Sequence, residues 1–170
     1  MPQNYRLGVF ITRLLLFIGC FLIGCAGFGG ELEPTLVVPS PTVDAWVVET
    51  AVSYQALRPI QGQFDGADWS DDVDLWMGKK HTLMIDLGNY FGEGDFACEM
   101  VVQTMGQPDQ IATPDHDLWP HIQTLPQIET LESTTIAEYL VYYWRSTNDF
   151  LIFICDDSMI TGSDWFYAGE

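Results

Sequence analysis

A series of aspartates in the first half of the chain supplies the oxygen ligands that hard cations prefer. Asp65, Asp68 and Asp71 follow one another at three-residue intervals. Calcium takes about six to eight oxygen ligands, so these residues are candidates for a calcium site. The spacing fits no EF-hand loop, and acids that face solvent near a helix start explain the same pattern without a metal.

Imidazole and carboxylate groups that could hold zinc occur together in a second segment. Asp115, His116 and Asp117 are consecutive, and His121 follows shortly after them. Zinc needs ligands that converge from about four directions, and His81 is the only further histidine. We expect His81 on the exposed side of its helix, so ordinary polar loop residues are the alternative interpretation.

Two cysteines in the second half of the chain could form a disulfide. Cys98 falls on a predicted helix and Cys155 ends a predicted strand. An exported protein meets an oxidising compartment, and packing of the helix on the sheet could bring the two sulfurs together. We therefore expect a Cys98–Cys155 disulfide; the alternative is two small buried thiols in a reduced core.

Motifs for catalysis are not visible in the sequence. No serine lies in a Gly-x-Ser-x-Gly turn, and there is no phosphate-binding loop. No cation stands beside Cys98 or Cys155 to activate a thiolate. We predict that the protein is not an enzyme, and an envelope hydrolase is the least favoured interpretation.

The N-terminal segment predicts export and a lipid anchor. Basic residues without acids precede an apolar stretch at 14–23, which is shorter than the about 20 residues that span a bilayer. Leu22, Ile23, Gly24 and Cys25 resemble the bacterial lipobox, in which the cysteine sulfur receives a diacylglycerol and a signal peptidase cuts before it. The resemblance implies a signal peptide at 1–24 and anchoring at Cys25 in the cell membrane or outer membrane, outside the cytoplasm. An uncleaved membrane anchor is the alternative.

Charge restricts the classes of partner. The chain has 24 acidic and six basic residues and a formal net charge of −18. Such a surface repels phosphate backbones, so we expect no nucleic-acid binding. The acidity suits a basic or metal-bearing partner, and a coat that keeps the protein soluble is the alternative.

The elements that must position these residues form one predicted α+β domain at 44–170, preceded by a tether rich in proline and glycine at 25–43. Residues 44–57 weakly favour a helix. A long helix is predicted from Ser70 to about residue 90, and a shorter one at 95–105. Alternating residues at 136–144, 150–155 and 159–167 predict three strands.

The expected architecture has two layers, with two N-terminal helices packed on a three-stranded antiparallel β-meander. One face of an antiparallel sheet can face water. Tyr139, Val141 and Tyr143 alternate along the first strand and would form a protein-binding platform on that outer face. The alternative is that they are core residues.

Several short motifs carry a resemblance to a known family. They are Gly94-Asp95, the segment at 101–109 that contains Gly106-Gln107-Pro108-Asp109, Tyr142-Tyr143-Trp144 and Phe150-Leu151-Ile152-Phe153. Residues 92–167 resemble the small outer-membrane-assembly lipoproteins of the BamE/SmpA type, in which a helix ending in Leu-Gly-x-Pro leads into an antiparallel sheet. The resemblance implies this fold, a lipid anchor and no enzymatic activity of the domain.

We therefore expect a lipid-anchored binding or scaffold module of the cell envelope that acts through protein–protein contacts. The alternative is an acidic inhibitor, or a lipoprotein that captures a solute or cation through the acidic region at 65–74. No cofactor is expected apart from the diacylglycerol on Cys25 and calcium as a candidate at the aspartates. The envelope partner is not identified by the sequence.

Overall fold

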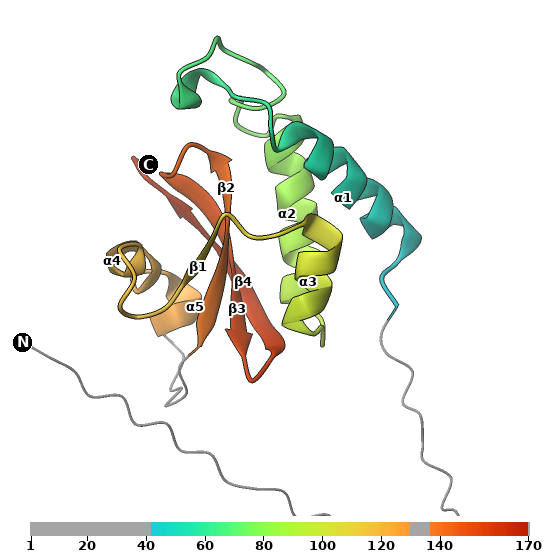
Figure 1. The fold of residues 1–170 in the computed structure, drawn as a ribbon, viewed down its shortest axis with the longest axis vertical. Helices are drawn as coiled ribbons and strands as arrows, with labels where there is room; N and C mark the ends of the chain where they lie inside the picture. The colour runs from blue at the N-terminus through green and yellow to red at the C-terminus, as the bar shows by residue number, and fades with distance from the viewer. Residues whose placement is uncertain (1–41, 130–136, 170) are drawn as a thin grey trace, which may run out of the picture. The chain divides into compact units, whose positions relative to one another are not determined.

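The computed structural model describes residues 42–129 and 137–169. Within these residues, helices come first and the long strands of the sheet come last (Figure 1). In chain order the elements are α1 (Ala45–Leu57), the 3-10 turn η1 (Gln63–Asp65), α2 (Lys79–Gly92), α3 (Cys98–Met105), β1 (Gln110–Ala112), α4 (Trp119–Ile122), α5 (Pro126–Glu129), β2 (Glu138–Arg145), β3 (Asp149–Asp156) and β4 (Met159–Tyr167).

The described strands form one antiparallel sheet in the order β1-β2-β3-β4. Two residues, Asp157 and Ser158, connect β3 to β4, and their φ angles are 46° and 67°. Positive φ at both positions makes the tight turn whose twist matches that of the paired strands. The three predicted C-terminal strands are confirmed, and β1 adds a short fourth strand beside β2.

One face of the sheet packs against the first three helices. α2 lies directly on the sheet, and α1 lies against α2 and α3. The core on this face is apolar and rich in aromatic residues. From the strands it includes Leu140, Tyr142, Trp144, Leu151 and Phe153, and from the helices Tyr54, Met84, Leu87, Phe91, Val101 and Met105.

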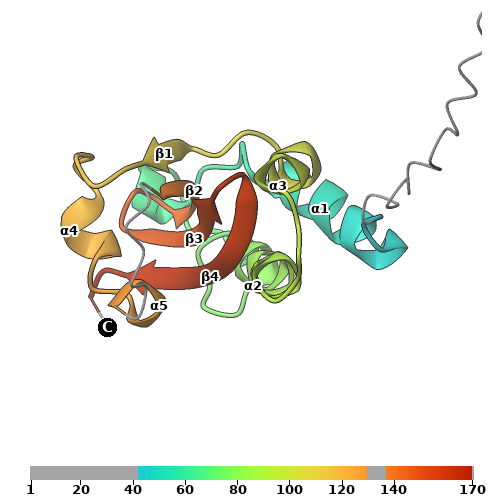
Figure 2. The same cartoon turned by 90° about the horizontal axis from the view of Figure 1, so that it is seen from below.

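The opposite face of the sheet is covered as well. α4 and α5 lie on the side away from α2 and α3, as Figure 2 shows. A second core joins them to the strands through Ile122, Leu125, Ile128, Tyr139, Val141, Phe150, Ile152 and Ile154. The expected α+β class is therefore confirmed, with helices on both faces of a four-stranded sheet, and the expected two-layer arrangement of two helices on three strands is not confirmed.

The sequence carries a signal for this third layer. β3 is apolar at successive positions and buried from Asp149 to Ile154. A strand whose two faces are both apolar is buried on both sides, whereas a half-exposed strand alternates apolar with polar residues. The third layer is formed by the short α4 and α5, which begin near Pro120 and at Pro126.

The helix predictions are right in part. The weakly favoured helix at 44–57 exists as α1, and the shorter helix exists as α3. The long helix was expected to begin at Ser70, but α2 begins only at Lys79. Residues 70–78 form turns instead, and Met77 adopts a positive φ of 57°, which a continuing helix does not contain.

Candidate binding surface

The predicted lipid-anchor residues lie outside the described part of the chain. These are Leu22, Ile23, Gly24 and Cys25, together with the signal peptide and most of the tether. No helix among the described residues is long and apolar enough to cross a membrane.

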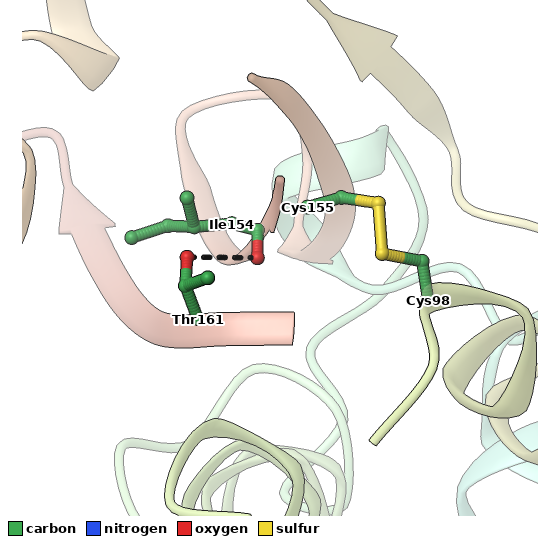
Figure 3. Close-up of a disulfide and its surroundings, with 4 residues drawn as sticks. All are labelled: Cys98, Ile154, Cys155 and Thr161. Carbon is green, nitrogen blue, oxygen red and sulfur yellow. Dashed lines mark hydrogen bonds between the residues drawn. A yellow bond between two sulfur atoms is a disulfide. The ribbon is translucent and has the colours of Figure 1, made fainter. Parts of the chain in front are cut away.

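The predicted disulfide is present. Cys98 at the start of α3 is bonded to Cys155 near the end of β3, with their Cα atoms 5.9 Å apart (Figure 3). A backbone hydrogen bond also joins α3 to the sheet beside the disulfide, because the Cys98 N–H donates to the Ser158 carbonyl in the β3–β4 turn. The bond fixes the helical layer to the end of the sheet, and it lines a cavity of about 480 Å³.

The expected platform on the outer face of the sheet does not exist. Tyr139 is 4% exposed and Val141 is fully buried, because α4, α5 and the adjoining turns cover them. Tyr143 is partly buried at the edge of the same core. The prediction that these three residues form an open contact surface is therefore corrected to a structural role in the second core.

Exposed apolar side chains gather instead in the connection between α1 and α2, residues 60–78, which we name the aromatic–acidic loop. Figure 1 shows it beyond the end of the sheet, above α1 and α2. Of the eleven large apolar side chains that are exposed in the described residues, six belong to this loop, and each is 43–56% exposed. They are Ile60, Phe64, Trp69, Leu75, Trp76 and Met77.

A buried carboxylate organises the backbone of the loop. Asp74 is fully buried, and its Oδ2 accepts hydrogen bonds from the backbone N–H of Gln63 at 2.9 Å and of Ser70 at 2.8 Å. Gly62 lies against the same carboxylate, so that a Cβ added there would come within 2.1 Å of Oδ1. Residues 62–63 near the start of the loop and Ser70 in its middle are thereby held around one side chain.

Side chains of strand β2 form hydrogen bonds with the backbone of the loop. The buried Trp144 donates from Nε1 to the Val73 carbonyl at 2.7 Å, and Arg145 donates to the Asp74 carbonyl at 3.1 Å. The Arg145 guanidinium also lies over the Phe64 ring, 4.6 Å from its centre, and pairs with Asp149 at 2.6 Å. These contacts present the exposed rings on a fixed backbone.

His81 connects the loop to the sheet and is fully buried, which corrects the expectation that it lies on an exposed helix side. Its ring stacks on Trp144 with centres 4.0 Å apart. Nδ1 accepts the Met77 N–H at 3.1 Å, and Nε2 lies 3.1 Å from the Tyr167 hydroxyl. Burial, together with the charge of Arg145, lowers the His81 pKa from 6.5 to about 4, so the ring is neutral at neutral pH.

The candidate metal ligands are not assembled in the described residues. No group of three or more His, Cys, Asp or Glu side chains in that part of the chain is placed to hold a metal ion. Asp71 accepts a hydrogen bond from Trp69 Nε1 at 2.6 Å, and Asp65 and Asp68 are exposed. In the candidate zinc segment, the Nδ1 of His116 accepts the Leu118 N–H at 3.2 Å.

A cavity of about 370 Å³ opens beside the loop. Arg58 pairs with Asp109 there at 2.5 Å, and the second oxygen of Asp109 accepts the Tyr143 N–H at 2.8 Å. Lys80 also lines the cavity and is only 5% exposed. The three-to-four spacing of apolar residues around Lys80 places this lysine on the buried face of its helix. The cavity could not be predicted in the same way, because the residues that line it are far apart in the sequence.

Comparisons of the chain with protein-family models, with curated proteins and with solved structures found no match. The resemblances to a lipobox and to lipoproteins of the BamE/SmpA type therefore stay predictions.

Proposed function

We propose that this protein is a non-enzymatic binding module of the cell envelope, anchored by lipid on Cys25, and that the aromatic–acidic loop is its contact surface. The observation that carries the proposal is the gathering of half-exposed apolar side chains on a loop with a fixed backbone. Apolar surface concentrated at one place on a protein marks sites of interaction.

The energetics favour a contact made through these side chains. Burying the exposed half of a large apolar side chain stabilises a complex by about 1 kcal/mol. Trp69, Trp76 and Phe64 are aromatic, and such residues dominate the energetically important positions of interfaces. Because Asp74 and Trp144 already order the backbone, little conformational entropy is lost when a partner binds.

Charge defines the chemistry of the partner as a basic protein surface with apolar positions. Four exposed acids, Asp65, Asp68, Asp71 and Asp72, lie between the apolar residues of the loop. They complement lysine and arginine on a partner and speed association with it. The same acids oppose insertion of the loop into a membrane of anionic lipid.

Support for the anchor comes from the lipobox-like residues 22–25 and the short apolar stretch before them. Two acyl chains hold a protein on a bilayer where one chain is marginal. The residues that follow, rich in proline and glycine, would let the domain reach a partner in the same envelope.

Site-specific photo-crosslinking of the full chain in its own membranes tests the contact surface. A photoreactive residue at Leu75 samples the loop, and one at the exposed Gln123 in the α4 region samples the opposite side of the sheet. We expect an adduct with a basic protein from Leu75 alone. The yield should fall at least about tenfold with Trp69→Ser, as expected for the loss of about 1.4 kcal/mol.

The matched control is Ile111→Ser, because Ile111 is 51% exposed but lies on β1, away from the loop sequence. This variant should leave the adduct yield unchanged. Equal adducts from Leu75 and Gln123, or equal losses from Trp69→Ser and Ile111→Ser, would contradict the proposed surface. Binding of the loop to protein-free anionic vesicles would also contradict it.

A further inference from the structure

The cavity beside the loop has the size of a small-molecule site and a polar lining. Its volume of about 370 Å³ lies in the range of about 300–1,000 Å³ that such sites occupy. Its lining combines Lys80 at the start of α2, Asp65 of η1 and the hydroxyl residues Ser146 and Thr147 of the β2–β3 turn. Segments far apart in the chain thus contribute polar groups to one cavity.

Lys80 is a buried cation whose charged form is favoured by the nearby acids Asp65, Asp109 and Asp74. Its side chain is 95% removed from solvent, and its ammonium forms no hydrogen bond or ion pair with the described residues. Burial lowers the Lys80 pKa, because the charged form loses its hydration. A carboxylate of a ligand in the cavity would replace the lost hydration.

Of the other charged residues of the cavity, Arg58 and Asp109 are paired directly and Asp65 is not. Arg58 and Asp109 neutralise each other, and both oxygens of Asp109 are hydrogen-bonded. Asp65 forms no hydrogen bond or ion pair within the described residues. The cavity therefore presents one cation and one anion, Lys80 and Asp65, that form no direct hydrogen bond or ion pair with each other or with other described residues.

We propose that this cavity binds a free α-amino acid, with its carboxylate on Lys80 and its ammonium toward Asp65. A simple anion would satisfy Lys80 but would be repelled by Asp65 and by the net charge of −18. A simple cation would leave Lys80 buried and unpaired. The hydroxyls of Ser146 and Thr147 can hydrogen-bond the remaining polar atoms of a zwitterion.

Calorimetric titration of the full chain in detergent with each of the common free amino acids tests this proposal. We expect at least one of them to bind. Its N-acetyl derivative lacks the ammonium, its amide lacks the carboxylate, and each should bind at least about tenfold more weakly, since each loses one charge pair.

Two pairs of variants provide matched controls. Lys80→Met should weaken binding at least about tenfold, whereas Lys79→Met, at the neighbouring exposed lysine, should leave it unchanged. Asp65→Asn should weaken binding and Asp68→Asn should not; because Asp65 is exposed, this pair serves even where Lys80→Met impairs folding. The proposal is overturned when no amino acid binds, when the N-acetyl derivative or the amide binds as well, or when each control loses as much as its partner variant.

Discussion

Replacing Cys98 and Cys155 together by alanine removes the covalent connection between α3 and β3. The two residues are separated by 57 positions, and the chain-entropy model gives about 4 kcal/mol for closing a loop of this length. Both side chains contact the core between the helices and the sheet, so the double variant also loses some packing. We expect the free energy of unfolding to fall by about 4 kcal/mol.

Urea unfolding followed by circular dichroism measures this change, with the free energies extrapolated linearly to water. A reductant supplies the control, because it should lower the stability of the natural protein to nearly that of the double variant and leave the variant unchanged. Mass spectrometry of the unreduced natural protein should find the peptides of Cys98 and Cys155 joined. A double variant whose free energy of unfolding lies within about 1 kcal/mol of the natural protein's would show that the disulfide does not stabilise the fold in this way.

Two further predictions concern the attachment of the aromatic–acidic loop. Asp74→Ala should lower the free energy of unfolding by about 3 kcal/mol, because it leaves two partly buried backbone N–H groups, of Gln63 and Ser70, without their acceptor. The exposed Asp68→Ala should change the free energy of unfolding by less than about 0.5 kcal/mol in the same urea assay. The folded-state pKa of His81, about 4, lies below the ordinary 6.5. The contribution of neutral His81 to the free energy of unfolding is therefore present above pH 6.5 and is lost as pH falls from 6.5 toward 4. Melting temperatures should fall less steeply across this pH window in His81→Asn than in the natural protein. The exposed His121→Asn is the control, and a slope that changes in His121→Asn but not in His81→Asn would contradict the assignment of the pH dependence to His81.

The C-terminal half of the fold could be predicted because its signals are local. Residues 136–167 contain apolar and aromatic runs separated by turn residues, and each run became a strand. The Cys98–Cys155 bond followed from an expected compartment and from helix-on-sheet packing. Burial of both sheet faces was missed because Tyr139 and Val141 were assigned to solvent, although residues 139–144 of β2 and 150–155 of β3 include no charged side chain of the kind that a wet face carries.

The aromatic–acidic loop could not be predicted because its conformation depends on distant residues. Ser70, Asp71 and Asp72 look like the start of a helix by local criteria. The loop instead follows the carboxylate of Asp74 and the indole of Trp144, which is 71 positions away from the carbonyl that it binds. Tertiary contacts of this kind override local propensity.

The fixed loop, the acidic surface and the predicted anchor together support the proposed function, in which the domain would be tethered to a membrane and would offer apolar and acidic groups to a basic partner. Without the anchor, the proposed contact would not be restricted to the envelope. The loop and the anchor belong to different parts of the chain, so each can be altered without the other.

Intact-mass spectrometry of the natural protein, extracted from its own membranes, tests the proposed lipid anchor. We expect a chain that begins at Cys25 and carries the added mass of a diacylglycerol, and a Cys25→Ala variant that lacks this mass and leaves the membrane fraction. A chain that begins at Met1 without acyl mass would contradict the proposed anchor, as would a Cys25→Ala variant that stays firmly bound to the membrane.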